Sequence, residues 1–72
     1  MEVGSKIKKY LEDNGISQTF LSKKTGIELP KLNLALNGNR KLTFTEYELI
    51  CGALNVEAGA FLEPRLPEVK GV

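Results

Sequence analysis

Turn-forming residues recur at short intervals along this chain and leave room only for short elements between them. Asn14-Gly15, Gly26 and Asn37-Gly38 each follow a block whose apolar residues have helical rather than alternating spacing. In the first block, apolar side chains fall at positions i, i+3 and i+4, with lysines on the other side. The chain is therefore predicted to be all-α, without a sheet.

Start and stop signals predict five helices. Ser17 is expected to cap the second, and Thr43 with Glu46 forms a T-x-x-E capping box that opens the fourth. A short fifth helix is expected to bring Phe61 and Leu62 into the core. The expected helical ranges are residues 4–14, 17–26, 28–37, 43–54 and 58–62.

The five helices are expected to form one domain over residues 1–63. Residues 64–72 contain two prolines and a glycine near the end, which prevent helix propagation, so they are expected to be a flexible tail. The alternative is an arm that grips a partner subunit through Leu66 and Val69. A chain of 72 residues has a small core and marginal stability, which favours a homodimer.

Composition excludes most catalytic and metal chemistry. The chain has no histidine and one cysteine, so disulfides, the usual zinc clusters and Ser-His or Cys-His pairs are ruled out. Cys51 lies in an apolar stretch and is interpreted as a small buried hydrophobe. No enzyme activity, cofactor or small-molecule substrate is expected. No stretch approaches the roughly 20 apolar residues of a membrane span, so a cytoplasmic protein is expected.

Charge is distributed unevenly although the net charge is only +1. Residues 1–42 carry eight Lys and Arg against four Asp and Glu, a net charge of +4. Residues 43–72 carry two Lys and Arg residues against five Glu residues, a net charge of −3. The net charge is too small by itself to indicate a polyanionic partner, but the acidic half is expected to face away from any phosphate backbone.

Two short helices joined by the turn Gly26-Ile27-Glu28 have helix-turn-helix geometry. The chain resembles the Cro/C1-type (XRE, lambda repressor-like) helix-turn-helix family in I-S-Q-x-x-L-S-x-x-x-G-I at residues 16–27, L-x-x-A-L-N-G at 32–38 and A-L-N-V at 53–56. The resemblance implies a compact five-helix bundle that binds double-stranded operator DNA, usually as a symmetric dimer. It also implies a bacterial or phage origin, because small members are frequent in phages, prophages and mobile elements.

The third predicted helix carries the positions expected to face the bases. At about 100° per residue, Leu32, Ala35 and Leu36 point inward, and the opposite side is left for the major groove. The expected base-facing residues are Leu29, Pro30, Lys31, Asn33 and Leu34.

Leu29, Pro30 and Leu34 are apolar where family members commonly carry Gln, Ser, Arg or Lys. Aliphatic groups cannot hydrogen-bond base edges, but they can pack on the thymine C5-methyl, and Lys31 and Asn33 remain for polar contacts. Readout could therefore favour T-rich steps or rely on DNA shape. An outward leucine on a small domain usually lies against a binding partner, and this partner could be a protein as well as DNA.

Phosphate contacts are expected on both sides of the third helix. The resemblance matches Gln18, beside Ser17, to a position where the family holds a phosphate with a Gln side chain and helix-start amides. The loop after the third helix adds further amides and cations. The expected phosphate-contacting residues are Ser17, Gln18, Asn37, Asn39, Arg40 and Lys41.

One departure from the family supports contact between the first and third helices. Many members join these helices by an Arg and a Glu at the positions matching Leu11 and Leu36, and both are leucine here. When both partners of a buried ion pair are replaced by apolar groups, no unpaired charge is left buried. The paired change predicts that these two helices touch.

The expected function is that of a Cro/repressor-type transcriptional regulator, a homodimer that places its third helix in the major groove of an operator. The alternative is a helix-turn-helix module for protein recognition through the apolar face, as in an antitoxin or anti-repressor.

Overall fold

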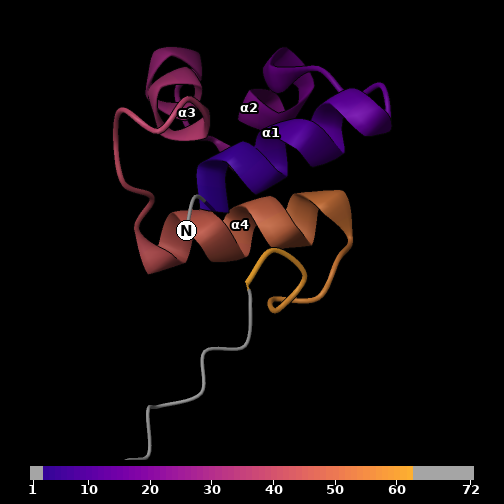
Figure 1. The fold of residues 1–72 in the computed structure, drawn as a ribbon. Coiled ribbons are helices and arrows are strands. Elements are labelled where there is room, and N and C mark those ends of the chain that lie inside the picture. Colours follow the sequence, from indigo (N-terminus) through magenta and orange to yellow (C-terminus); the bar gives the residue numbers. More distant parts are fainter. Residues whose placement is uncertain (1–2, 63–72) are drawn as a thin grey trace, which may run out of the picture.

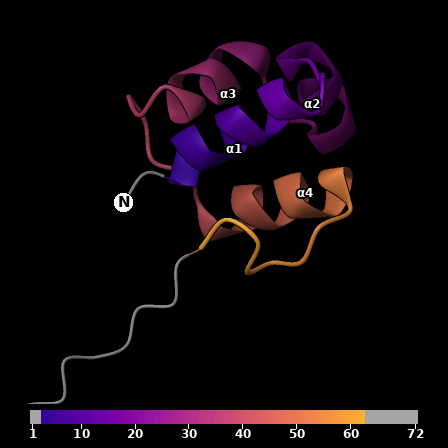
Figure 2. The ribbon, with the colours of Figure 1, turned by 45° about the vertical axis from the view of Figure 1, so that its right-hand side comes forward.

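The computed structural model describes residues 3–62, which form an all-helical bundle. Among these residues there are four helices and no strand: α1 (Val3–Asp13), α2 (Gln18–Thr25), α3 (Leu29–Leu36) and α4 (Phe44–Leu54). Figures 1 and 2 show α3 and α4 on opposite sides of α1. The expected tail at residues 64–72 and its alternative, an arm, lie outside the described residues.

The ends of α2 follow from the residues at its caps. The hydroxyl of Ser17 accepts a hydrogen bond from the amide of Phe20 at 3.0 Å, which satisfies one of the first-turn donors. Gly26 ends the helix with φ at 78°, a left-handed conformation that costs glycine little. The structure therefore confirms both predicted boundaries of the second helix.

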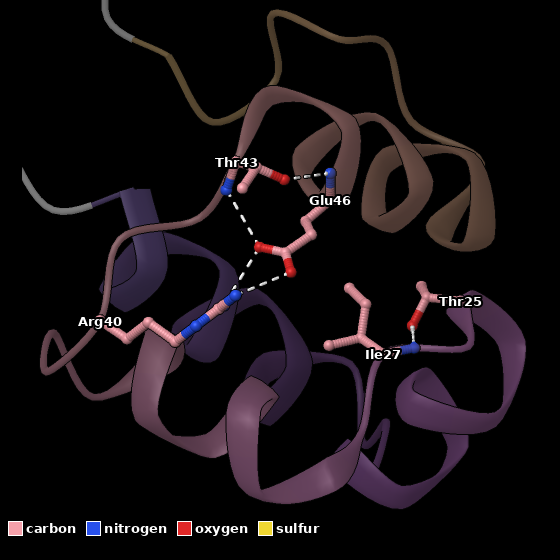
Figure 3. A network of polar contacts seen from close by, with 5 residues as sticks. All are labelled: Thr25, Ile27, Arg40, Thr43 and Glu46. Carbon is pink, nitrogen blue, oxygen red and sulfur yellow. Dashed lines mark hydrogen bonds and ion pairs between the residues drawn. The ribbon is translucent and has the colours of Figure 1, made fainter.

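The start of α4 is the predicted capping box. The Thr43 hydroxyl accepts from the Glu46 amide at 3.1 Å, and the Glu46 carboxylate accepts from the Thr43 amide at 3.0 Å. Figure 3 shows these two bonds and the guanidinium of Arg40, which reaches the same carboxylate. The core side of α4 carries Tyr47, Ile50 and Cys51, all of which are buried, and Cys51 is thus buried as the sequence predicts.

The predicted fifth helix at residues 58–62 is wrong. Two turns replace it, closed by bonds from the Ala60 amide to Glu57 and from the Leu62 amide to Gly59. Forming the first turn of a helix fixes the backbone of several residues for a single hydrogen bond, which costs conformational entropy. A stretch of five residues adds too few further hydrogen bonds to offset that cost. Phe61 is buried as expected, but Leu62 is 46% exposed.

A single apolar core joins the four helices and the segment after α4. Phe61 packs edge-on against Tyr10 and Tyr47, with ring centroids 5.5 and 6.5 Å apart. The Tyr47 hydroxyl donates a hydrogen bond to the carbonyl of Ala58, and burial raises the pKa of that hydroxyl. The buried apolar residues that form the cluster are Ile7, Leu11, Leu21, Ile27, Leu32, Leu36, Tyr47, Ile50, Cys51 and Phe61.

Helices α1 and α3 cross at very short range. A Cβ built on Gly4 of α1 would lie 2.1 Å from the carbonyl oxygen of Ala35 in α3. Only glycine allows the two backbones to approach so closely. Leu11 and Leu36, the pair predicted to replace a charged contact, are both buried in the same cluster, and the two helices pack together as expected.

Candidate nucleic-acid interface

Helix α3 has one buried and one exposed side, as its spacing predicts. Leu32, Ala35 and Leu36 are buried at 0, 2 and 0% exposure. On the outer side, Leu29 is 40% and Leu34 is 45% exposed. Pro30, Lys31 and Asn33 are exposed as well. All five residues expected to face bases are therefore open to solvent.

The turn that joins α2 to α3 is fixed by two hydroxyl side chains. Thr25 is buried, its hydroxyl donates to the carbonyl of Leu21 at 2.8 Å, and it accepts from the amide of Ile27 at 3.2 Å. Figure 3 shows the bond between Thr25 and the Ile27 amide. The Ser22 hydroxyl donates to the Ile27 carbonyl at 2.5 Å. These bonds hold the angle at which α3 leaves α2.

Four polar side chains form a hydrogen-bonded series that we call the amide ladder: Lys8, Asn37, Asn33 and Gln18. The Lys8 ammonium donates to the side-chain oxygen Oδ1 of Asn37 at 2.8 Å, and the side-chain Nδ2 of Asn37 donates to Oδ1 of Asn33 at 3.2 Å. The Asn33 amide then donates to Gln18 at 3.2 Å. The amide ladder therefore links α1, the end of α3 and the start of α2 along one exposed surface.

The start of α2 places an amide-rich helix terminus beside the amide ladder. First-turn amides of a helix lack intrahelical acceptors, and the helix dipole makes this end attractive to anions. The Ser17 hydroxyl is occupied by the Phe20 amide, so its role here is to cap the helix. The Gln18 side chain accepts from Asn33, which holds it next to α3.

The loop after α3 contains Asn39, Arg40 and Lys41 in different environments. The Asn39 amide donates to the carbonyl of Leu34 at 2.8 Å, which folds the loop back on the helix. The guanidinium of Arg40 forms a bidentate ion pair with Glu46 at 3.1 and 2.9 Å. Lys41 is exposed. Of the two cations expected to meet phosphate, Arg40 is thus held by a carboxylate of α4.

The Arg40–Glu46 pair shifts the pKa of both groups. Hydrogen bonds from Arg40, and next from the Thr43 amide, hold the pKa of the Glu46 carboxyl below its usual range. The hydrogen bond to Glu46 likewise raises the pKa of Arg40. The pair ties the loop after α3 to the start of α4.

Residues predicted from separate parts of the sequence thus meet on one side of the molecule. Asn33 is hydrogen-bonded to both Gln18 and Asn37, and the exposed apolar side chains lie on the same helix as Asn33. Sequence reasoning missed Lys8, whose partner lies 29 positions away. The basic character of the first helix was the only signal for it, because spacing along one helix cannot identify a partner on another.

Metal and membrane sites are not found in the part of the chain that the structure describes. Residues 3–62 contain no group of three or more Cys, Asp or Glu residues arranged to hold a metal ion. No helix among them is sufficiently long and apolar to cross a bilayer.

Comparison with known proteins gives a family and no individual relative. Neither the curated proteins nor the solved structures include a match to this chain. The family model described as the Cro/C1-type HTH DNA-binding domain matches residues 6–64. This range contains α2, the turn, α3 and α4 entire, together with the loop that carries Arg40 and Lys41. The protein therefore belongs to the Cro/C1-type helix-turn-helix DNA-binding domain family.

Proposed function

We propose that this protein is a transcriptional regulator of the repressor type that binds a DNA operator with α3 in the major groove. The observation that carries the proposal is the surface on which the exposed side of α3 stands next to the start of α2, tied to it by the bond between Asn33 and Gln18. A helix presented in this way fits the width of the major groove. We place the protein in the cytoplasm of a bacterium, encoded by the host or by a phage.

Phosphate contacts are proposed on both sides of α3. Gln18 and the first amides of α2 hold one phosphate, and Asn37, Asn39 and Lys41 meet the backbone on the other side. Such contacts fix the register of the helix in the groove, while the side chains of α3 read sequence. Arg40 contributes by holding the loop in place through its ion pair with Glu46.

The operator is proposed to be bound by a homodimer, with half-sites about one helical turn apart. The surface proposed for dimer contact is an apolar hollow of about 280 Å³ at the start of α4. Phe44 stands 70% exposed at its edge. A projecting ring beside an apolar hollow is self-complementary, so two copies related by a two-fold axis can each insert Phe44 into the other. The hollow is lined by Val3, Leu42, Thr43, Phe44, Tyr47 and Leu62.

Selection of bound sequences from a random duplex library, at two salt concentrations, tests the proposal. The expected winner has dyad symmetry, and the logarithm of its affinity falls with the logarithm of salt at a slope near −0.9 for each phosphate contacted. Absence of duplex binding, or binding that does not respond to salt, would contradict the proposal.

Protein recognition is the second candidate function, because Leu29 and Leu34 leave apolar surface on the outer side of α3. The substitution Leu34→Lys separates the two candidates. On a DNA reader the added cation keeps or strengthens nonspecific DNA binding, since it faces a polyanion. On a protein-binding surface the buried charge abolishes the complex.

A further inference from the structure

One polar side chain on the reading surface, that of Asn33, is already hydrogen-bonded within the protein. Asn33 donates from its amide nitrogen to Gln18 and accepts at its amide oxygen from Asn37, both at 3.2 Å. A bidentate contact to adenine needs the same nitrogen and oxygen aimed at one base edge. Turning the Asn33 amide toward a base therefore costs two existing hydrogen bonds, and this weakens Asn33 as a reader of adenine.

The side chains that remain on the outer side of α3 are mainly apolar. Leu29 and Leu34 are 40 and 45% exposed, Pro30 is exposed, and Lys31 stands between them in sequence. Among the groups that the major groove presents, the thymine C5-methyl is the apolar one. A cytosine methylated at C5 carries the same group at the same place. Lys31 is exposed on α3 itself, and Lys8 is bonded to Asn37 directly after this helix, so positive charge lies on and beside α3. Such charge suits a groove lined by phosphates better than an apolar protein surface.

We propose that the protein recognises its operator by the C5-methyl groups of pyrimidines, packed against Leu29, Pro30 and Leu34, rather than by hydrogen bonds from α3 to purine edges. This inference rests on the proposed function, since it assumes that α3 lies in the major groove. The major groove of the operator must then display a C5-methyl group at the contacted positions. Thymine and 5-methylcytosine satisfy it, whereas uracil and unmodified cytosine do not.

The test replaces thymine by deoxyuridine, one position at a time, in the operator obtained by selection. The replacement removes one methyl group and leaves the hydrogen-bonding groups of the base pair unchanged. Burial of one such group contributes about 0.8 kcal/mol, so each contacted thymine is expected to lower affinity about fourfold when replaced. Replacement in both half-sites is expected to lower it about 15-fold, because separated positions add. At a contacted C·G pair, 5-methylcytosine is expected to bind about fourfold more tightly than cytosine.

A matched pair of variants connects the methyl group to its side chain. Leu34→Ala and Leu49→Ala each shorten a leucine that is 45% exposed, the first on α3 and the second on α4. Both residues lie outside the core and alanine favours helix, so both variants are expected to fold. In Leu34→Ala the fourfold difference between thymine and deoxyuridine is expected to vanish at the position that Leu34 contacts. In Leu49→Ala it is expected to persist at every position.

The outcomes separate this inference from the proposed function. Tight binding to the selected operator without any loss on deoxyuridine replacement would overturn methyl recognition and leave DNA binding intact. A thymine preference that is equal in the wild type and in Leu34→Ala and Leu29→Ala would also overturn it, because DNA shape would then be the source. Absence of binding to every duplex, with capture of a protein through α3 instead, would overturn both proposals.

Discussion

Arg40 and Lys41 are neighbours in the loop after α3, but they are not equally available to contact a phosphate. Arg40 donates two hydrogen bonds to Glu46, whereas Lys41 is exposed. An arginine that forms a bidentate pair has already oriented its donors. Lys41 is therefore the residue of this loop that we expect to release a counterion from DNA.

The substitution Lys41→Ala is expected to weaken binding about equally for all sequences. It is expected to make the slope of log affinity against log salt shallower by about 1.8 on the full operator, because each of the two subunits loses one phosphate contact. Fluorescence anisotropy with a labelled operator over a series of salt concentrations measures both effects. Lys9→Ala, which removes an exposed lysine bonded to Asp13 at 3.3 Å on α1, is the charge-matched control and is expected to keep the original slope. An unchanged slope in Lys41→Ala would remove this residue from the proposed site.

Glu46 is expected to make stability depend on pH in the acid range. Its pKa is lowered in the folded state, by Arg40 first and by the Thr43 amide next, so its contribution is fully present above the unfolded pKa of about 4.3. That contribution is lost as the pH falls through the lower, folded pKa. Urea unfolding is expected to show Glu46→Gln as less stable than wild type at pH 7, with the difference narrowing as the pH approaches 3. Glu48→Gln, on the exposed side of the same helix, is the control for loss of one negative charge. A difference in the free energy of unfolding between wild type and Glu46→Gln that stays constant with pH would contradict this role of Glu46.

At the scale of elements, the crossing of α1 and α3 depends on one missing side chain. The carbonyl oxygen of Ala35 occupies the place where a Cβ on residue 4 would lie. Backbone atoms cannot move aside as a flexible side chain can, so any larger residue at position 4 has to push the two helices apart. Gly52, on α4, is also helical, but no atom lies within 4 Å of its ideal Cβ.

The variants Gly4→Ala and Gly52→Ala are therefore expected to have opposite effects on stability. Alanine favours a helix over glycine by about 0.8–1 kcal/mol, and this gain applies alone at position 52. At position 4 the overlap with Ala35 is expected to cost about 1–3 kcal/mol and to exceed the gain. Chemical denaturation followed by circular dichroism measures both changes. Equal stabilisation by the two substitutions would mean that α1 and α3 are not in contact at this point.

The elements were predictable to the extent that their signals are local. Ser17, Gly26 and the pair of Thr43 with Glu46 act within a few residues, and the structure has the helix ends where these residues indicate. The helix predicted at residues 58–62 does not form, yet Phe61 is buried as expected, because its ring packs against Tyr10 and Tyr47 from a segment of two turns. Tertiary packing, rather than propensity, shapes that segment.

At the scale of the whole molecule, the outward side of α3 was predictable from periodicity, but the connections across it were not. A rotation of about 100° per residue identifies Leu34 as outward from the sequence alone. The bonds of Asn33 to Gln18 and of Lys8 to Asn37 join residues that are 15 and 29 positions apart. No spacing rule within one helix specifies such pairs, because they depend on how the helices are arranged in space.

Association of two copies through the hollow beside α4 is the prediction that belongs to this scale. Phe44→Glu is expected to give a monomer in sedimentation at concentrations where the wild type is a dimer. Burying one phenylalanine side chain contributes about 2 kcal/mol, and the two-fold symmetric interface contains two of them. Loss of both is expected to raise the dissociation constant of the dimer roughly 1000-fold. Affinity for the full operator is expected to fall accordingly, while affinity for an isolated half-site stays the same. Leu49→Glu, which places the same charge elsewhere on α4, is the control, and an unaltered dimer in Phe44→Glu would locate the contact elsewhere.

The backbone contact at Gly4 also has a genetic consequence. Gly4 is buried in the first turn of α1 and is not among the residues that we propose to meet bases, yet its contact with Ala35 sets the position of α3. A screen for altered operator preference should therefore recover substitutions at this codon together with those at outward α3 codons. Such alleles would be suppressed by second changes that reposition α3, whereas alleles of the outward residues would be suppressed by changes in the operator itself.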